Sequence, residues 1–214
     1  MGDIDAVYGD LSRLSTLNPS NLVLPIQLAQ IAYYILGSEH AMNHIKQCLH
    51  YDPDSKACKK VHKTLRRLQK DTTKARELVD SGNWRQAIKI LDGSEGLLAR
   101  FEEAYKEASQ PGGHLSERLP KSKSITSRSR LDLYGMACKA SVGANDFGKR
   151  GMKWCDVVLS MDEENVDALV AKGERLLKDE SWDEAVRTLQ RAFELTGNSS
   201  QDVSDFFLAF LFSL

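Results

Sequence analysis

The segment from Val166 to Gly197 constrains the fold of this 214-residue chain more than any other stretch. It contains two runs of apolar residues at helical spacing, separated by a polar break at 179–181. Each predicted helix is too short to bury its apolar side alone, so the pair must pack together and then against neighbours. Gly173 and Ala185 are small residues placed where the two helices would cross. The segment therefore predicts a helical hairpin that repeats along the chain.

The same segment resembles the tetratricopeptide repeat (TPR), a helix-turn-helix unit of about 34 residues. The residues that carry this resemblance are Gly173, Trp182, Asp183, Glu184, Ala185 and Ala192. Gly197 stands where the repeat usually closes with proline, and glycine can also end a helix. The resemblance implies an all-α chain whose TPR-type hairpins stack into a right-handed superhelical solenoid. An ordinary helical bundle is the alternative.

Further copies of the repeat keep the same register. Gly151 precedes Ala185 by 34 positions, and Cys155 precedes Leu189 by the same interval. We expect a single solenoid over residues 1–214 with repeats at about 21–54, 55–109, 131–164 and 165–198. The residues expected to pack the repeats, with both tryptophan rings in the core, are Ala41, Pro53, Trp84, Ala87, Gly151, Gly173, Trp182, Ala185 and Ala192.

Composition limits the classes of partner. The formal net charge is −1, so no global field favours nucleic acid or an anionic membrane. No apolar run reaches the roughly 18 residues of a membrane span. The first dozen residues contain no apolar core of a secretory signal peptide. Either a cytosolic protein or a piece of a longer secreted protein fits these observations.

Two segments fall outside the predicted repeats. Residues 110–130 are rich in Pro, Gly, Ser and basic residues, which predicts a flexible connector, with docking of an acidic partner as the alternative. Residues 199–214 end in an uncharged apolar run, which favours a capping helix or an incomplete end over a membrane role. Asn198 begins a glycosylation acceptor triplet that would matter only in a lumenal protein.

The four cysteines fall into two sensible pairs. Cys48 lies near the end of one predicted helix and Cys58 in the first turn of the next, so the reversal between them brings them within disulfide reach. Cys138 and Cys155 lie on the two helices of one hairpin. We expect both pairs to be disulfide-bonded, which places the chain in an oxidising compartment. The alternative is four reduced, buried thiols, since free cysteine behaves as a small apolar residue.

No pattern in the sequence supports catalysis. His40 and His44 stand four positions apart and could share a metal, but no third ligand is near, and we expect a polar surface pair. No Cys-x-x-Cys cluster fits zinc, and no nucleophile has a recognisable base. We therefore expect a binding protein that is not an enzyme, with no metal, no cofactor and no catalytic residue.

The predicted binding surface is the groove that the first helices of stacked hairpins line. The repeat register places these apolar residues in it: Val23, Ile26, Tyr33, Leu133, Met136, Val170 and Leu177. The alternative is that several of them pack between repeats. TPR proteins that grip acidic chaperone tails use Lys and Asn where this chain has Ile26 and Gln30, so that carboxylate clamp is absent. An apolar groove instead suits extended or unfolded segments of a client.

Two stretches, residues 45–91 and 165–189, resemble the later TPR portion of an endoplasmic-reticulum J-domain co-chaperone. That family is also called the inhibitor of interferon-induced protein kinase, and its cysteine pattern matches as well. The resemblance implies a lumenal TPR stack that holds unfolded clients and passes them to the chaperone BiP through a J domain. It also implies restraint of stress-activated kinases.

The chain departs from that family in one respect that bears on activity. It contains no His-Pro-Asp triplet, so we expect it to lack the J domain and the ability to stimulate an ATPase chaperone, as a fragment or shortened relative. The predicted function is a non-catalytic module that holds unfolded polypeptides in the endoplasmic-reticulum lumen, with the cytoplasm as the alternative location. The alternative function is a regulatory scaffold that binds one folded partner, such as a stress-activated kinase or a chaperone.

Overall fold

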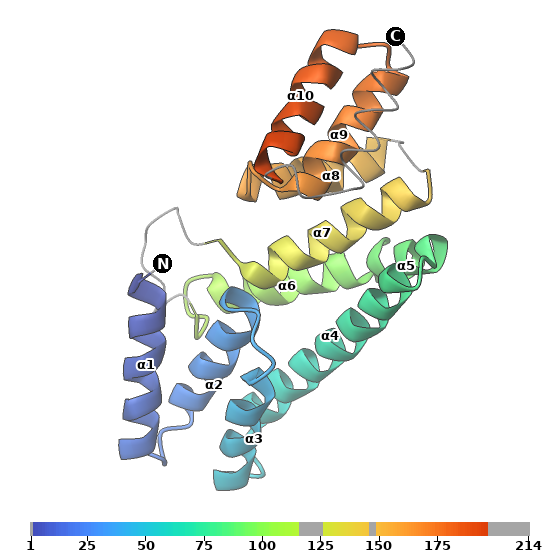
Figure 1. Cartoon of the computed structure of the whole chain (residues 1–214). Helices are drawn as coiled ribbons and strands as arrows, with labels where there is room; N and C mark the ends of the chain where they lie inside the picture. Colours follow the sequence, from blue (N-terminus) through green and yellow to red (C-terminus); the bar gives the residue numbers. More distant parts are fainter. Residues whose placement is uncertain (1, 116–125, 146–148, 197–214) are drawn as a thin grey trace. The chain divides into compact units, whose positions relative to one another are not determined.

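The computed structural model describes residues 2–115, 126–145 and 149–196 of the chain. In this part of the chain every regular element is a helix (Figure 1), which confirms the predicted all-α class. The elements in chain order are α1 (Gly2–Leu17), α2 (Val23–Gln30), the π-helical turn η1 (Ile31–Ile35), α3 (Ala41–Tyr51), α4 (Lys56–Asp80), α5 (Trp84–Leu91), α6 (Leu97–Ser109), α7 (Arg128–Gly143), α8 (Lys149–Met161), α9 (Val166–Lys178) and α10 (Trp182–Leu195).

The chain divides into two compact units. Unit 1 comprises Met1–Lys74 with Asp92–Arg130, and unit 2 comprises Ala75–Leu91 with Leu131–Leu214. The predicted repeats contain α2, η1 and α3 (21–54), α4 to α6 (55–109), most of α7 and all of α8 (131–164), and α9 and α10 (165–198). The repeat boundaries and the single solenoid over residues 1–214 stay predictions.

The centre of unit 1 is the stretch 24–35, in which every residue is buried. Its sequence, LPIQLAQIAYYI, is apolar on nearly all sides, and a helix of this kind needs neighbours all round. α1 and α3 pack against it (Figure 1). Its last turn widens to π spacing, where Leu36 N donates to Ile31 O at 3.1 Å. Such π turns occur frequently at functional sites.

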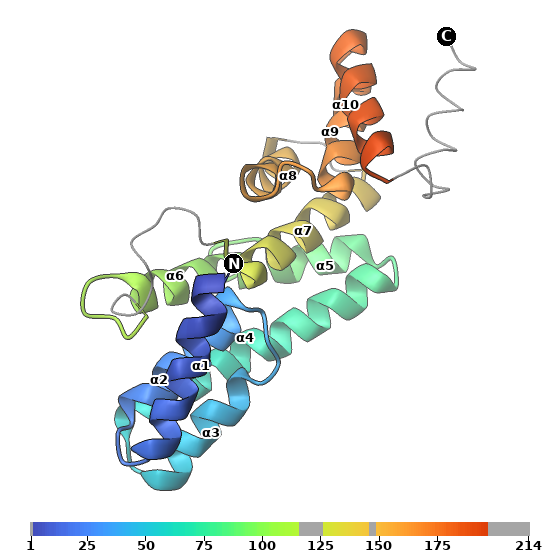
Figure 2. The same ribbon diagram turned by 60° about the vertical axis from the view of Figure 1, so that its left-hand side comes forward.

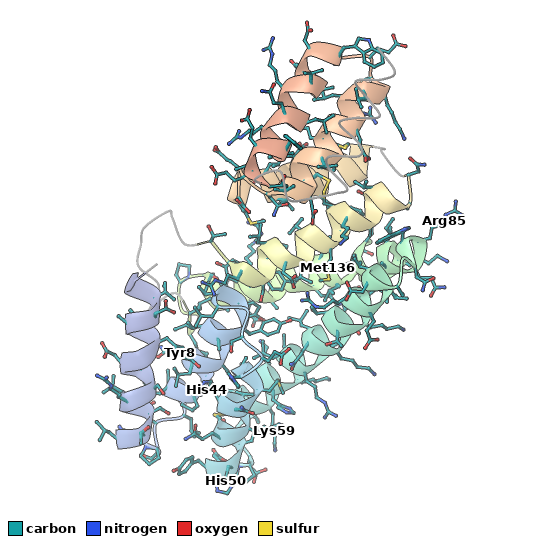
Figure 3. The ribbon with its side chains drawn as sticks, in the orientation of Figure 1. Tyr8, His44, His50, Lys59, Arg85 and Met136 are labelled. Atoms are coloured by element: carbon teal, nitrogen blue, oxygen red, sulfur yellow. A yellow bond between two sulfur atoms is a disulfide. The ribbon has the colours of Figure 1, made fainter. Side chains whose placement is uncertain are left out.

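A polar contact joins α1 to α3 within unit 1. Tyr8 lies beside His44 (Figure 3), with the Tyr8 hydroxyl 2.6 Å from His44 Nε2. Burial lowers the pKa of His44, and the neighbouring His40 lowers it further. A neutral imidazole can accept a hydrogen bond from the Tyr8 hydroxyl through Nε2. His44 is therefore part of the contact between α1 and α3, whereas His40 is exposed. Among the described residues, no cluster of His, Cys, Asp and Glu could hold a metal ion.

α4 is a long amphipathic helix with one buried face. Cys58, Leu65 and Leu68 are buried at helical spacing, whereas the opposite face is charged and exposed. Its first part is tied to α6 by ion pairs, because Asp71 Oδ2 lies 2.7 Å from Arg100 Nη1 and Lys60 pairs with Glu107 near the other end of α6. These pairs set α6 alongside the part of α4 between Lys60 and Asp71.

Both cysteine pairs are disulfide-bonded in the structure. Cys48–Cys58 links α3 to α4 in unit 1, with a Cα–Cα distance of 6.1 Å. Cys138–Cys155 links α7 to α8 in unit 2, with a Cα–Cα distance of 4.8 Å. All four cysteines are buried, so each bond lies inside a hydrophobic contact between consecutive helices.

Unit 2 contains the helical hairpin predicted over residues 166–197. α9 lies beside α10 in both views (Figures 1 and 2). Asn165 Oδ1 accepts a hydrogen bond from Ala168 N and so caps the start of α9. Gly173 leaves room for Leu189 at the crossing, since an added Cβ would lie 2.5 Å from the leucine side chain. Ala185 is fully buried.

The predicted packing residues have different environments. The following are buried: Ala41, Ala87, Gly151, Gly173, Ala185 and Ala192. Trp84 is half-buried, with its ring against Gly143. Trp182 is 50% exposed, so the expectation of a core tryptophan is wrong there, because its position at the start of α10 leaves the ring at the end of the hairpin. Pro53 is also exposed, and it disfavours the helical conformation at Asp52, which is extended and ends α3.

The structure describes part of the predicted loop and none of the predicted tail. Of the loop predicted at 110–130, residues 110–115 form turns at the end of α6 and 128–130 already belong to α7, whereas 116–125 lie outside the described residues. The predictions for Asn198 and for the tail at 199–214 also lie outside them. No helix in the described part of the chain is long and apolar enough to span a membrane.

Candidate binding site

The structure buries most of the residues predicted to line a client groove. Ile26 and Leu133 are each 1% exposed, and Tyr33 and Met136 are also buried. Side chains in this state contribute to the core and cannot reach a client, so the prediction is wrong for these four. Val23 is 40% exposed at the start of α2, and Val170 and Leu177 are half-buried on α9 (Val166–Lys178). For these last three a role in binding stays a prediction.

A pocket of about 300 Å³ opens in unit 1 instead. Its walls come from α2 and η1, from the first half of α4, and from the end of α6 with the turn that follows it. The residues that line it are Gln30, Tyr34, Ala57, Lys60, Val61, Thr64, Leu65, Ala104, Glu107, Ala108, Gln110, Pro111, Gly112, Gly113 and His114. The volume fits one or two side chains of a bound polypeptide and is at the small end of ligand sites.

One wall of this pocket contains Tyr34, whose ring belongs to an aromatic cluster that backs the wall. The ring of Tyr34 lies 5.5 Å from Phe101 and 5.5 Å from Tyr105, centroid to centroid, and Phe101 is fully buried. Burial raises the pKa of Tyr34 above its ordinary value, with Tyr33 and Glu107 adding to the shift. The phenol therefore stays neutral, and the wall is rigid and largely apolar.

Hydrogen bonds to backbone carbonyl oxygens hold the two ends of this wall. Ser127 Oγ donates to Tyr34 O, and Ser129 Oγ donates to Tyr33 O. On the far side the turn after α6 folds back, and Leu115 N donates to Ala108 O at 3.0 Å. The side chain of Leu115 is fully buried, so the Gly112–Gly113 turn is held against the pocket.

One buried polar group of the pocket lacks a partner. Gln30 is only 7% exposed, and no donor in the described part of the chain lies within hydrogen-bonding distance of its Oε1. A buried acceptor left unpaired destabilises a fold by about 1–3 kcal/mol. The last side-chain torsion of glutamine is soft, so the amide can turn toward the pocket and both accept and donate there. A peptide backbone offers the complementary N–H and C=O groups.

The rim of the pocket is polar and shows no catalytic arrangement. Lys60 pairs with Glu107 across the opening, and His114 stands on the turn after α6. Among the described residues of the lining, Thr64 is the single serine, threonine or cysteine, and its hydroxyl is not hydrogen-bonded to a basic side chain. The geometry suits binding of an apolar side chain together with its backbone.

Neither Gln30 nor Tyr34 is among the apolar residues that the sequence predicted to line a binding groove. The signal available in the sequence was the pair Gln27 and Gln30 in an otherwise apolar helix, since glutamine is unusual inside a core. The remaining lining residues come from segments up to 84 positions apart, from Gln30 to His114, and nothing local in the sequence brings them together.

Comparison with known proteins identifies relatives of the chain in sequence and in fold. No family model matches the chain. The chain is 56% identical, over 208 residues, to the tetratricopeptide repeat and J domain-containing co-chaperone DNJ1 of Cryptococcus neoformans, a match that covers 95% of the chain and 39% of the relative. It is 32% identical to the protein of the same name from Mycosarcoma maydis, over 94% of the chain and 37% of the relative.

A solved structure also resembles this one. The crystal structure of the P58(IPK) TPR domain superposes with a TM-score of 0.61 at 22% identity, covering 94% of this chain and 49% of that one. The fold is a TPR fold. The chain spans less than two fifths of the length of the two curated relatives, so the similarity concerns part of each co-chaperone.

Proposed function

We propose that this chain is a non-catalytic TPR module of a co-chaperone, which holds apolar segments of unfolded polypeptides. The observation that carries the proposal is the pocket of unit 1, which is lined by Tyr34, backed by Phe101, and by Gln30, whose Oε1 has no partner. An apolar side chain fills the pocket, and its backbone pairs with the glutamine amide. The similarity to J-domain co-chaperones along 95% of the chain supports this class of function.

The proposal includes an oxidising location, the lumen of the endoplasmic reticulum. Its support is the pair of buried disulfides, Cys48–Cys58 and Cys138–Cys155, because such bonds persist where thiols are oxidised. Peptide mapping without reductant, on protein blocked with a thiol reagent in its own cells, is expected to recover both linked pairs. Free thiols at all four positions would remove the lumenal part of the proposal and leave the binding function untouched.

Replacing Gln30 with methionine separates a binding role from a structural one. We expect the affinity for a reduced, unfolded model polypeptide to fall about fivefold, the equivalent of one hydrogen bond. The free energy of unfolding is expected to stay level or to rise by up to about 1 kcal/mol, because an unpaired buried acceptor is removed. Fluorescence anisotropy of the labelled polypeptide and denaturant unfolding of the full chain measure the two quantities.

The matched control is Gln47→Met, which changes an exposed glutamine of α3 (Ala41–Tyr51) in the same unit. It is expected to leave the affinity unchanged. A Gln30→Met variant that loses stability and keeps its affinity would show that the glutamine is structural and that the pocket is not the site. One folded partner bound at a saturable site, with no binding of unfolded polypeptide, would favour the regulatory scaffold instead.

A further inference from the structure

We infer that the basic face of α4 (Lys56–Asp80) makes this site selective for acidic segments. In the favoured partner, Asp and Glu residues follow the apolar side chain that enters the pocket and lie along α4. The inference rests on the proposed function, since it takes the pocket of unit 1 as the anchor. It adds the chemistry of the segment that is held.

The basic residues of α4 fall on one face of the helix. Between residues 56 and 74 there are eight Lys or Arg residues and one acidic residue, Asp71. The eight are Lys56, Lys59, Lys60, Lys63, Arg66, Arg67, Lys70 and Lys74, called the basic stripe below. Their spacings of three, four and seven place them side by side along the helix. At 1.5 Å per residue the basic stripe is about 27 Å long.

The basic stripe is exposed and largely unpaired. All eight of its residues are exposed. Lys59 (labelled in Figure 3) pairs with Asp54, and Lys60 pairs with Glu107, whereas Asp71 on the same helix is held by Arg100. The other six have no acidic partner within 4 Å among the described residues. Like charges at this spacing repel one another, so a bound anion relieves that repulsion.

The basic stripe adjoins the pocket. Lys60 belongs to both, and Ala57, Val61 and Thr64 line the pocket from the next face of the same helix. A segment anchored in the pocket therefore leaves it beside Lys60 with the basic stripe in reach. An extended chain of about eight residues has the length of the basic stripe.

The residues of the basic stripe favour an acidic polypeptide over other polyanions. Residues 56–74 contain no Phe, Tyr or Trp, the side chains on which single-stranded nucleic acid stacks. The stripe also carries no apolar residue that could enter a membrane surface, because Leu65 and Leu68 face the core. Flexible lysines dominate it, and they suit carboxylates at irregular spacing.

Three matched peptides test the selectivity. Each has one central leucine and is otherwise rich in Glu, Gln or Lys, and binding to the full chain is followed by fluorescence anisotropy. We expect the Glu peptide to bind about tenfold more tightly than the Gln peptide, on the scale of a few exposed ion pairs, and the Lys peptide to bind most weakly. The advantage of the Glu peptide is expected to shrink as salt is raised from about 0.05 M to about 0.5 M.

Charge reversal on the basic stripe supplies the second measurement. The double variant Lys63→Glu/Arg67→Glu is expected to abolish the preference for the Glu peptide without changing the affinity for the Gln peptide. The control Lys46→Glu/Lys89→Glu makes the same charge change at exposed sites on α3 and α5 (Trp84–Leu91), and it is expected to keep most of the preference.

The outcomes separate the inference from the proposed function. Equal binding of the Glu and Gln peptides, both weakened by Gln30→Met, would overturn the inference and leave the proposed function standing. No binding of either peptide would overturn both. Single-stranded RNA and phosphatidylserine vesicles are tested as competitors of the labelled Glu peptide. If either displaces it at a lower concentration than the unlabelled Glu peptide does, the choice of an acidic polypeptide as the partner is overturned.

Discussion

Replacing Phe101 with alanine is expected to lower the free energy of unfolding by about 3–5 kcal/mol, the range for a large aromatic removed from a core. The ring is fully buried in α6 (Leu97–Ser109) and lies within 6.4 Å of Tyr33, Tyr34 and Tyr105, centroid to centroid. Alanine would leave a cavity behind Tyr34, which lines the pocket. The affinity for unfolded polypeptide is therefore expected to fall together with the stability.

Denaturant unfolding followed by circular dichroism measures this loss. The chain's three tryptophans, at positions 84, 154 and 182, all lie in unit 2, so tryptophan fluorescence follows unit 2 and the helical signal reports on both units. Leu17→Ala is the control, because Leu17 is 81% exposed and its removal is expected to change stability by less than about 0.5 kcal/mol. A loss below about 1 kcal/mol for Phe101→Ala would contradict the described core of unit 1.

Replacing Gly173 with valine is expected to destabilise unit 2 by about 3 kcal/mol, the upper part of the range for overpacking. An added Cβ would lie 2.5 Å from both Cγ and Cδ2 of Leu189, which is itself only 1% exposed and has no room to move. The crossing of α9 and α10 would have to open. Tryptophan fluorescence during denaturant unfolding measures the change.

The control for this variant is Gly135→Ala. Gly135 lies within α7 (Arg128–Gly143) of the same unit, and an added Cβ there would meet nothing within 4 Å. Alanine is expected to raise stability by up to about 1 kcal/mol through helix propensity. If Gly173→Val were as harmless as Gly135→Ala, the helices would not cross at Gly173 and the assignment of this hairpin would be wrong.

Much of the fold could be predicted because its signals are local. The apolar spacing of 166–195, the small residues Gly173 and Ala185, and the turns between helices all act over a few residues. The cysteine pairs could be predicted for the same reason, because each disulfide joins two helices that follow one another in the chain. A repeat signature, however, predicts which residue type occupies each position and does not predict how deeply its side chain is buried. Trp182 matches the signature and still lies half in solvent.

The candidate site depended on contacts that no local pattern encodes. The register that predicted Ile26 and Leu133 in a groove could not tell a groove face from a core face, and packing buried both. The basic stripe of α4 is fully visible in the sequence, but its position beside a pocket is not.

The amino-acid sequence by itself determined helices, hairpins and cysteine partners, because each depends on periodicity or chain reversal over short distances. Tertiary structure decided which surfaces remained open, because the pocket forms only where α2 (Val23–Gln30), α4 and α6 meet. It also decided that Oε1 of Gln30 has no partner, since burial removes water from an acceptor that the surrounding core does not satisfy.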